Sequence, residues 1–496
     1  MAELQIVPQF SAIGTYYDNI TLSSQNKNAE LVGQLQPGIL ISHTTRKTEL
    51  NLDYEFNYYK YYGDEFEDRQ SNTGSATANF ELIENHLFLD SSVVVSQQVL
   101  DPAQASNAGS AVFVGNETES RTFYYRPRLR NRFGGFMLSE ILYESTFTEY
   151  TEGRIEETQH SNLRGEFNSG DLFDRLSWVL TLSKEEDENR LANNYLANGS
   201  MNYTINEWYV FASGAANKYG YLGGLEGLSP YFIHAQGGAG WTPSRKIAFE
   251  LGVGTRINES GLTDGNVKLE NKTWRASINF RPTNRTNLSI SRDEAVFGSR
   301  ESLNFSHTMR RVIISANYSE ALTTPQILRE QTRAAQALGS GNENIGLGGD
   351  NIGGTASGTN IGLFDLAVTN DVLLHQQLNG NMSIQYRRLV LSGGGGYSRG
   401  EYQTANIVTR QFEVNSRAQL QLGGRTSLSG SMSARRYYFS TSASGDNLYS
   451  AECSINRQIQ RQINTSLSYV WSKRSTSTDI NYSANRVVAQ LTMDFN

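Results

Sequence analysis

The sequence predicts an all-β fold: one large antiparallel transmembrane β-barrel of about 24 strands, with 22 or 26 also compatible, formed by residues 1–496 as a single domain. Two observations carry this prediction. Apolar and polar residues alternate along the chain from end to end, and the connections between these segments alternate between short turns and longer polar stretches. We expect the short turns to be periplasmic and the long loops to be extracellular.

The composition fits a barrel and excludes several other classes. Mean hydropathy is −0.47, and the longest unbroken apolar run covers only residues 208–212, whereas a transmembrane helix needs about 20 apolar residues. The single cysteine, Cys453, excludes a disulfide framework and a cysteine-cluster metal site. A net charge of −7 argues against a general nucleic-acid binder. The six histidines are scattered without paired spacing, so we expect no metal site and no cofactor.

Three segments show the strand pattern most clearly. Residues 49–59 read ELNLDYEFNYY, with polar side chains at odd positions and apolar or aromatic ones at the even positions up to 58. Residues 274–281 repeat this alternation, and residues 426–434 place four serines at every second position from Ser427 to Ser433. Alternate side chains of a strand point to opposite faces. We therefore expect an apolar face against lipid and a polar face in the lumen.

Eleven tight turns join these segments two at a time, which gives about 24 strands when the first and last are included. The tight turns lie near residues 44–47, 85–86, 134–135, 170–171, 205–206, 243–245, 282–284, 310–311, 387–388, 423–424 and 460–462. The longer polar stretches are 18–28, 63–70, 99–119, 151–157, 219–229, 257–267 and 321–370.

Aromatic residues gather near both ends of the predicted strands. Phe133 and Trp208 flank short turns, whereas Tyr17, Tyr61 and Trp471 lie near long loops. Two interfacial aromatic belts are typical of a barrel in a bilayer.

The last strand-like segment, residues 487–495, reads VVAQLTMDF. Leu491, Met493 and Phe495 share one face, and a single Asn follows the terminal aromatic residue. This segment resembles the assembly signal of bacterial outer-membrane barrels, which implies the barrel-assembly machinery as a partner. The first residues run directly into a strand pattern. We therefore interpret the sequence as a mature chain without a signal peptide, located in the bacterial outer membrane.

Four further segments are similar to the PEP-CTERM system-associated outer-membrane β-barrel family. They are YDNITL at 17–22, ENHLFLDSSVVVSQQ at 84–98, MRRVIISANYSEALTT at 309–324 and LFDLAVTNDVLLHQQLNGNMSIQY at 363–386. Their order and spacing also fit, so the resemblance covers most of the chain. It implies a location in the outer membrane and a context of exopolysaccharide or surface-protein secretion. It supplies no catalytic residues.

An arginine ladder is the most informative polar feature. Arg126, Arg128, Arg130 and Arg132 occupy every second position of one predicted strand. Arginine on the lipid face at the bilayer midplane costs roughly 2–4 kcal/mol, so the ladder should face the lumen. Two interpretations remain open: a path for anionic substrate, since guanidinium groups bind carboxylates and phosphates, or charge pairing with Glu140 and Glu144 of the next strand, which also take lumen positions.

Other predicted lumen positions carry charges of both signs. Arg275, Arg281 and Arg435 are basic and extend the candidate anionic path, whereas residues 49, 53 and 55 are acidic. Serine, asparagine and tyrosine fill much of the remaining lumen face, which suits passage of a glycan and equally of water.

Residues 321–370 form the longest insert between predicted strands. Positions 325–338 have a helix-like pattern that opens with Pro325, a favoured first-turn residue. A segment of this length is usually functional or disordered. We expect either a lumen constriction or a surface loop.

We find no catalytic motif and expect no enzyme activity. The sequence favours an outer-membrane channel for export of a polymer, an exopolysaccharide in the context of the resemblance, that acts passively with a periplasmic or inner-membrane secretion machine. The expected partners are the lipid bilayer, the polysaccharide and that machine, with no nucleic acid. A general diffusion porin, or a sleeve that holds a lipoprotein, a surface fibre or a multihaem cytochrome, remains an alternative.

Overall fold

A computed structural model of the chain describes residues 3–63, 66–99, 117–151, 157–187, 192–218, 231–259, 272–295, 298–323, 373–402, 408–439, 445–476 and 481–495. It contains 24 strands in one sheet. Their bounds are β1 (Glu3–Tyr17), β2 (Glu30–Thr44), β3 (Thr48–Tyr61), β4 (Arg69–Ile83), β5 (Leu87–Val99), β6 (Glu117–Phe133), β7 (Met137–Tyr150), β8 (Thr158–Ser169), β9 (Leu176–Asp187), β10 (Ala192–Ile205), β11 (Trp208–Lys218), β12 (Tyr231–Ser244), β13 (Ile247–Glu259), β14 (Lys272–Thr283), β15 (Thr286–Ala295), β16 (Gly298–Thr308), β17 (Val312–Thr323), β18 (Leu373–Gln385), β19 (Leu389–Tyr402), β20 (Val408–Gln421), β21 (Thr426–Phe439), β22 (Asp446–Gln460), β23 (Ile463–Ser475) and β24 (Tyr482–Asp494).

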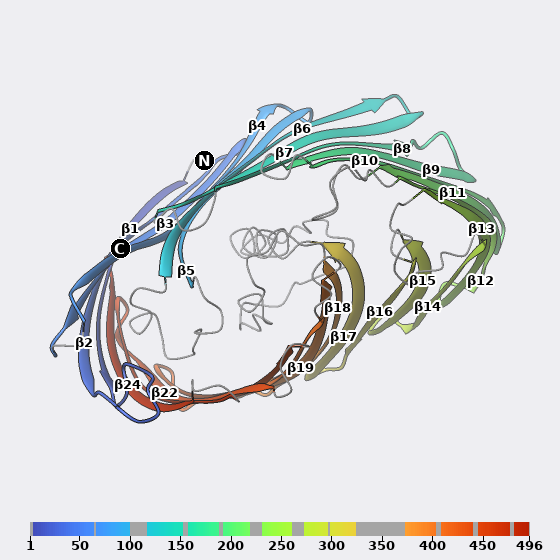
Figure 1. The fold of residues 1–496 in the computed structure, drawn as a ribbon. Coiled ribbons are helices and arrows are strands. Elements are labelled where there is room, and N and C mark those ends of the chain that lie inside the picture. Colours follow the sequence, from blue (N-terminus) through green and yellow to red (C-terminus); the bar gives the residue numbers. More distant parts are fainter. Residues whose placement is uncertain are drawn as a thin grey trace.

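The sheet is a closed barrel. Each strand pairs antiparallel with its neighbours in the chain, and β1 pairs with β24 from Gln9↔Asp494 to Tyr17↔Arg486. Figure 1 shows this wall as a continuous ring that is elongated in cross-section, with β2 near one end and β11 to β13 near the other. Among the described residues, no helix is long and apolar enough to cross a membrane. The predicted fold class and the predicted number of strands are confirmed.

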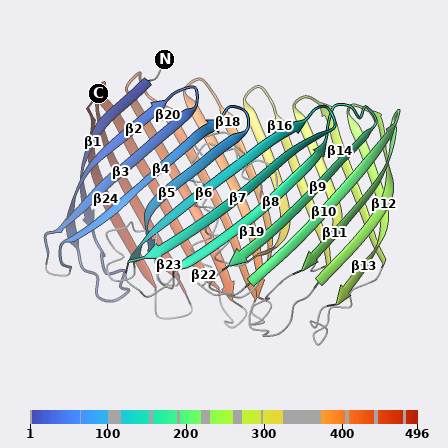
Figure 2. The ribbon, with the colours of Figure 1, turned by 90° about the horizontal axis from the view of Figure 1, so that it is seen from above.

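The short turns and both termini lie at one end of the barrel (Figure 2). All eleven predicted turns join two strands there. Asn85, Gly134 and Asn206 have φ angles of 60°, 56° and 58° at three of these turns. Glycine and asparagine tolerate this left-handed conformation best, which explains why the sequence marks these turns clearly.

The other end differs in one respect from the sequence prediction. Not every connection at this end is long, since only two residues separate β15 from β16 and only four separate β9 from β10. Short connections of this kind carry too little sequence signal to stand out from the strands that they join.

The outward face of the wall is apolar. Val253, Val414 and Met432 are 73%, 63% and 67% exposed, and their neighbours along the strand turn inward. In water such a surface would be a large exposed apolar patch. A closed barrel with this exterior is the architecture of outer-membrane proteins, because closure leaves no backbone edge unpaired in the lipid.

Some of the aromatic residues that the sequence assigns to the belts face the lipid, and others point into the barrel. Phe133 and Trp208 are about half exposed on the outward face near the short turns. Tyr17 and Tyr61 instead point inward and are almost fully buried, where they pack with Ile20, Val32 and Tyr59. The prediction that Tyr17 and Tyr61 belong to a belt was wrong, because each lies one position out of phase with the lipid-facing residues of its strand.

Candidate functional site

The inward face of the barrel is the candidate site, because it is the surface that a transported molecule would meet. Arg126, Arg128, Arg130 and Arg132 lie on the inward face of β6, since the intervening positions Tyr125, Leu129 and Phe133 are exposed on the outward face. The ladder therefore lines the lumen.

The first two arginines of the ladder are held by a carboxylate of β5. Arg126 donates from Nε and Nη2 to Asp90 Oδ2 at 3.0 and 2.8 Å, and Arg128 Nη2 lies 3.8 Å from the same oxygen. The side chains of Asp90, Arg126 and Arg128 are only 11%, 16% and 14% exposed. Glu144 lies 3.8 Å from Arg126 Nη1 and accepts a hydrogen bond from Tyr124. These charges form a compact, largely desolvated network in the wall.

The last two arginines are more accessible and lie near the short turns. Arg130 Nε donates to Glu140 Oε2 at 2.6 Å, and the side chain of Arg130 is 49% exposed. Arg132 pairs with Asp171 and its side chain is 61% exposed. Exposed ion pairs contribute about 0–1 kcal/mol, so an incoming anion can replace these carboxylates at little cost.

The remaining sequence-predicted arginines are spread around the ring. Arg275 Nε lies 2.6 Å from Glu250 Oε1 in the neighbouring strand. Arg281 Nε donates to Asn287 Oδ1 at 2.8 Å, and Arg435 Nε lies 3.2 Å from Glu413 Oε2, whose side chain is 3% exposed. The structure does not bring these three residues together with the ladder of β6.

Asp90 is the functional residue that sequence reasoning missed. It faces Arg126 directly across the β5–β6 pair. Its only signal in the sequence is a lone carboxylate at an inward position of an otherwise uncharged segment. Its pairing with Arg126 depends on the register between two strands separated by a long loop, which the sequence pattern does not fix.

A second part of the lumen is dominated by uncharged hydroxyl and amide groups. We call the following inward residues of β21 to β24 the polar wall: Ser427, Ser429, Ser431, Ser433, Ser450, Ser454, Asn456, Asn464, Ser466, Ser468, Gln490 and Thr492. Hydroxyls pair across strands, with Oγ atoms 2.6 Å apart between Ser429 and Ser454 and 2.7 Å apart between Ser433 and Ser450.

A polar hollow of about 440 Å³ lies at the turn end of this wall. Its lining includes Gln421, Asn456, Asn464, Gln490 and Thr492, together with Arg425 and Arg457. Most of these groups carry both a donor and an acceptor, which is what sugar hydroxyls require for recognition.

The loop end of the lumen is narrowed by the connection between β1 and β2. Ile20 is fully buried in this connection and packs on Tyr17, Val32 and Tyr59. Leu22 of the same segment packs on the inward cluster around Leu448 and Tyr482. This segment therefore folds inward over β1 to β3 and β22 to β24. The predicted long insert 321–370 lies outside the described residues apart from 321–323, which belong to β17.

An aromatic ring packs on glycine near β11 to β13, at one end of the elongated cross-section of the barrel. Phe211 of β11 is 7% exposed and faces Gly238 of β12. A Cβ atom at Gly238 or at Gly252 would lie 2.7 Å from the Phe211 ring. Arg275 covers the same ring, with its Cζ atom 5.5 Å from the ring centroid. Only glycine leaves room for this close approach.

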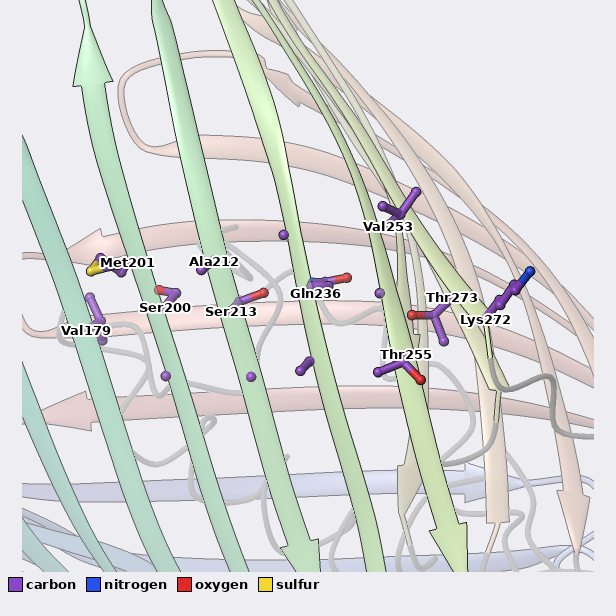
Figure 3. Close-up of a pocket in the computed structure, with 15 residues that line it drawn as sticks. Val179, Ser200, Met201, Ala212, Ser213, Gln236, Val253, Thr255, Lys272 and Thr273 are labelled. Atoms are coloured by element: carbon purple, nitrogen blue, oxygen red, sulfur yellow. The ribbon is translucent and has the colours of Figure 1, made fainter.

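A wider hollow of about 910 Å³ lies against β9 to β14, and Figure 3 shows its labelled side chains distributed along these strands. Gly199, Gly214, Gly237 and Gly254 contribute to its lining together with apolar side chains such as Met201 and Val253. Polar side chains also line it, namely Ser200, Ser213, Gln236, Thr255, Lys272 and Thr273.

An acidic contact at the extracellular rim connects the start of β4 to β3. Asp68, just before β4, accepts hydrogen bonds from Lys60 Nζ at 2.8 Å and from Tyr58 Oη at 2.9 Å. These hydrogen bonds lower the pKa of Asp68 below its usual range. Elsewhere, the described ranges contain no group of three or more histidine, cysteine, aspartate and glutamate side chains that could hold a metal ion.

Comparisons with known proteins give a likeness in fold alone. No protein-family profile and no curated protein matches the sequence. Among solved structures, the chain is similar to a variant of the ferric enterobactin receptor PfeA from Pseudomonas aeruginosa, with 10% identity, a TM-score of 0.47, and coverage of 99% of this chain and 80% of that one. It is also similar to the siderophore receptor PirA from Pseudomonas aeruginosa, with 10% identity, a TM-score of 0.41 and the same coverage. OccK2 from Pseudomonas aeruginosa matches at 8% identity, with a TM-score of 0.31 and coverage of 99% and 98%.

Proposed function

We propose that the barrel is a passive outer-membrane channel for the export of a polymer, specifically an exopolysaccharide, and that a periplasmic or inner-membrane machine delivers it. The observation that carries the proposal is the polar wall of β21 to β24 with its hollow at the turn end. The turn end is the periplasmic end of a barrel of this kind, so an exported chain would meet this surface first.

Uncharged hydrogen-bonding groups suit the movement of a glycan. A single hydrogen bond contributes only about 0.5–1.5 kcal/mol net, because it replaces a hydrogen bond to water. Sugar hydroxyls can therefore exchange partners step by step along the polar wall without being held at any one place. The channel needs no chemical step for this, and energy comes from the machine that delivers the polymer.

Arg130 and Arg132 extend the proposal to acidic polymers. They are the accessible members of the ladder and lie near the periplasmic turns. The carboxylates of an acidic glycan would compete there with Glu140 and Asp171. The inner members, Arg126 and Arg128, remain bound to Asp90 and stabilise the barrel wall.

Single-channel conductance in a planar bilayer tests the proposal. We expect a neutral oligosaccharide added on the periplasmic side to interrupt the current. An acidic oligosaccharide should do so at about tenfold lower concentration. R130Q/R132Q should abolish the advantage of the acidic glycan, whereas R281Q, a matched change at a distant lumen arginine, should preserve it.

A different outcome would overturn the proposal. A steady current that neither oligosaccharide interrupts from the periplasmic side would indicate a general diffusion porin. A barrel that carries no current, and that purifies with a stoichiometric protein in its lumen, would indicate a sleeve.

A further inference from the structure

Three arginines lie on the outward, lipid-facing side of β19 to β21, near the extracellular ends of these strands. Arg399 faces Arg410 directly across the β19–β20 pair. Arg410 faces Tyr438 on β21, and Arg436 faces Phe412 on β20. These residues share a face with Val414 and Met432, two of the most exposed apolar side chains of the exterior.

Six of the outward residues form two rows across the three strands. The inner row is Tyr397, Phe412 and Arg436, and the outer row is Arg399, Arg410 and Tyr438. We call these six residues the rim grid. Its rings pack on each other, with centroids 4.8 Å apart between Tyr397 and Phe412 and 6.4 Å apart between Phe412 and Tyr438.

The rings fix the depth of the rim grid in the membrane. Amphipathic aromatic side chains lie at the level of the lipid headgroups. Successive residues on one face of a strand are about 6.6 Å apart. Arg399 and Arg410 therefore lie one step above Tyr397 and Phe412, at the level where the polar groups of the outer leaflet begin.

Among the described residues, the charges of the rim grid are balanced only in part. Arg399 Nη2 lies 3.0 Å from Glu401, but within the described part of the chain Arg410 and Arg436 have no ion pair with a carboxylate. Cζ of Arg436 lies 4.7 Å from the centroid of the Tyr438 ring. The nearby carboxylate of Glu320 instead accepts hydrogen bonds from Tyr318 and Gln376.

Two like charges directly opposite each other destabilise a strand pair. Glu401 pairs with Arg399, so the charge that an added anion can neutralise is that of Arg410 and Arg436. Guanidinium groups bind phosphate through two parallel hydrogen bonds. A phosphate monoester carries about −1.5 to −2 charges at neutral pH, which is sufficient to neutralise the excess of the rim grid.

We propose that the rim grid binds the phosphate of a phosphorylated glycolipid of the outer leaflet, of the lipid A type. Arg399 and Arg410 hold the phosphate between them, and Arg436 contacts it from the third strand. The rings of Tyr397 and Phe412 and the side chains of Val414 and Met432 contact the sugar and the first part of the acyl chains. This site lies outside the barrel and does not depend on what passes through the lumen.

Native mass spectrometry of the detergent-purified barrel, titrated with diphosphorylated lipid A, tests the proposal. We expect one tightly bound lipid per wild-type barrel. Each of R399Q and R410Q should weaken it at least tenfold, and R399K/R410K should bind better than R399Q/R410Q because the charge remains. Lipid A without phosphates should bind no variant tightly.

Arg292 provides a matched control. It also faces outward near the extracellular rim, with Cζ 4.4 Å from the centroid of the Trp274 ring, but the residues directly opposite it are Ala276 and Glu301 and no second arginine faces it. R292Q should therefore leave the affinity unchanged. All variants should show the heat-dependent gel mobility of a folded barrel.

Three results would overturn the proposal: affinity of R399Q/R410Q within threefold of wild type, equal binding of dephosphorylated lipid A, or equal competition by phosphatidylglycerol. The last result would show a general attraction to anionic lipids instead of a site for an outer-leaflet glycolipid.

Discussion

Replacement of Asp90 by asparagine should destabilise the barrel by about 3 kcal/mol. D90N keeps the shape of the side chain but removes the charge that holds Arg126 at 2.8 Å and lies 3.8 Å from Arg128. Breaking a buried ion pair costs roughly 3–5 kcal/mol, because the remaining charge is left without compensation in a desolvated site. We place the value at the lower end because Glu144 still lies 3.8 Å from Arg126.

The matched control is E140Q, which removes the partner of Arg130 on the same face of the wall. Both side chains of that pair are more exposed, at 30% and 49%, so the cost should be about 0–1 kcal/mol. The assay is urea unfolding of the barrel in phospholipid vesicles, followed by tryptophan fluorescence. D90N/R126Q should be more stable than D90N alone, because one uncompensated charge is then absent.

The reasoning is refuted if D90N and E140Q destabilise the barrel equally. Equal effects would mean that water reaches Asp90 as freely as Glu140, and that the inner arginines are available to a transported anion as well.

Further predictions concern the two faces of the wall, the aromatic contact on glycine and the extracellular rim. Met432→Arg should destabilise the barrel by roughly 2–4 kcal/mol in vesicles, whereas Ser433→Arg, one position along on the lumen face, should cost much less; equal costs in the same urea assay would contradict the assignment of faces. Gly252→Val should cost about 1–3 kcal/mol, because a Cβ atom there would lie 2.7 Å from the Phe211 ring, and Gly252→Val/Phe211→Ala should recover part of that loss. Because the pKa of Asp68 is lowered, its contact with β3 should persist above the usual aspartate pKa and be lost as the pH falls through the lowered value; protection of the amides at the end of β3 against hydrogen exchange, relative to the intrinsic rate at each pH, should fall in acid in wild type and should already be low at neutral pH in D68N.

The number of strands and the two faces of the wall were predictable because their signals are local. Alternation with a period of two is a property of the chain alone, and residues such as Asn85, Gly134 and Asn206 mark turns that require a positive φ. The same alternation placed Arg126 and Arg130 in the lumen before any contact was known. It also supplied Glu140 as a partner, because a tight turn fixes the register between β6 and β7.

Contacts between strands joined by long loops were not predictable in this way. Asp90 meets Arg126 because of the register between β5 and β6, and the number of residues in the loop between them does not determine that register. The burial of Ile20 has the same kind of origin, because Ile20 packs on Tyr17, Val32 and Tyr59, which belong to three different strands.

The rim grid also combines features that the sequence predicts with contacts that only the tertiary structure decides. The positions of Arg399, Arg410 and Arg436 within their strands are fixed by the alternating pattern. Their meeting on three neighbouring strands follows from registers that only the assembled sheet defines. The chain alone thus determined a barrel, its number of strands and which side chains face lipid, because these follow from local periodicity and turn chemistry. The closed structure decided which charges neutralise each other and which remain for a ligand, because ion pairing depends on distances across strands that are far apart in the sequence.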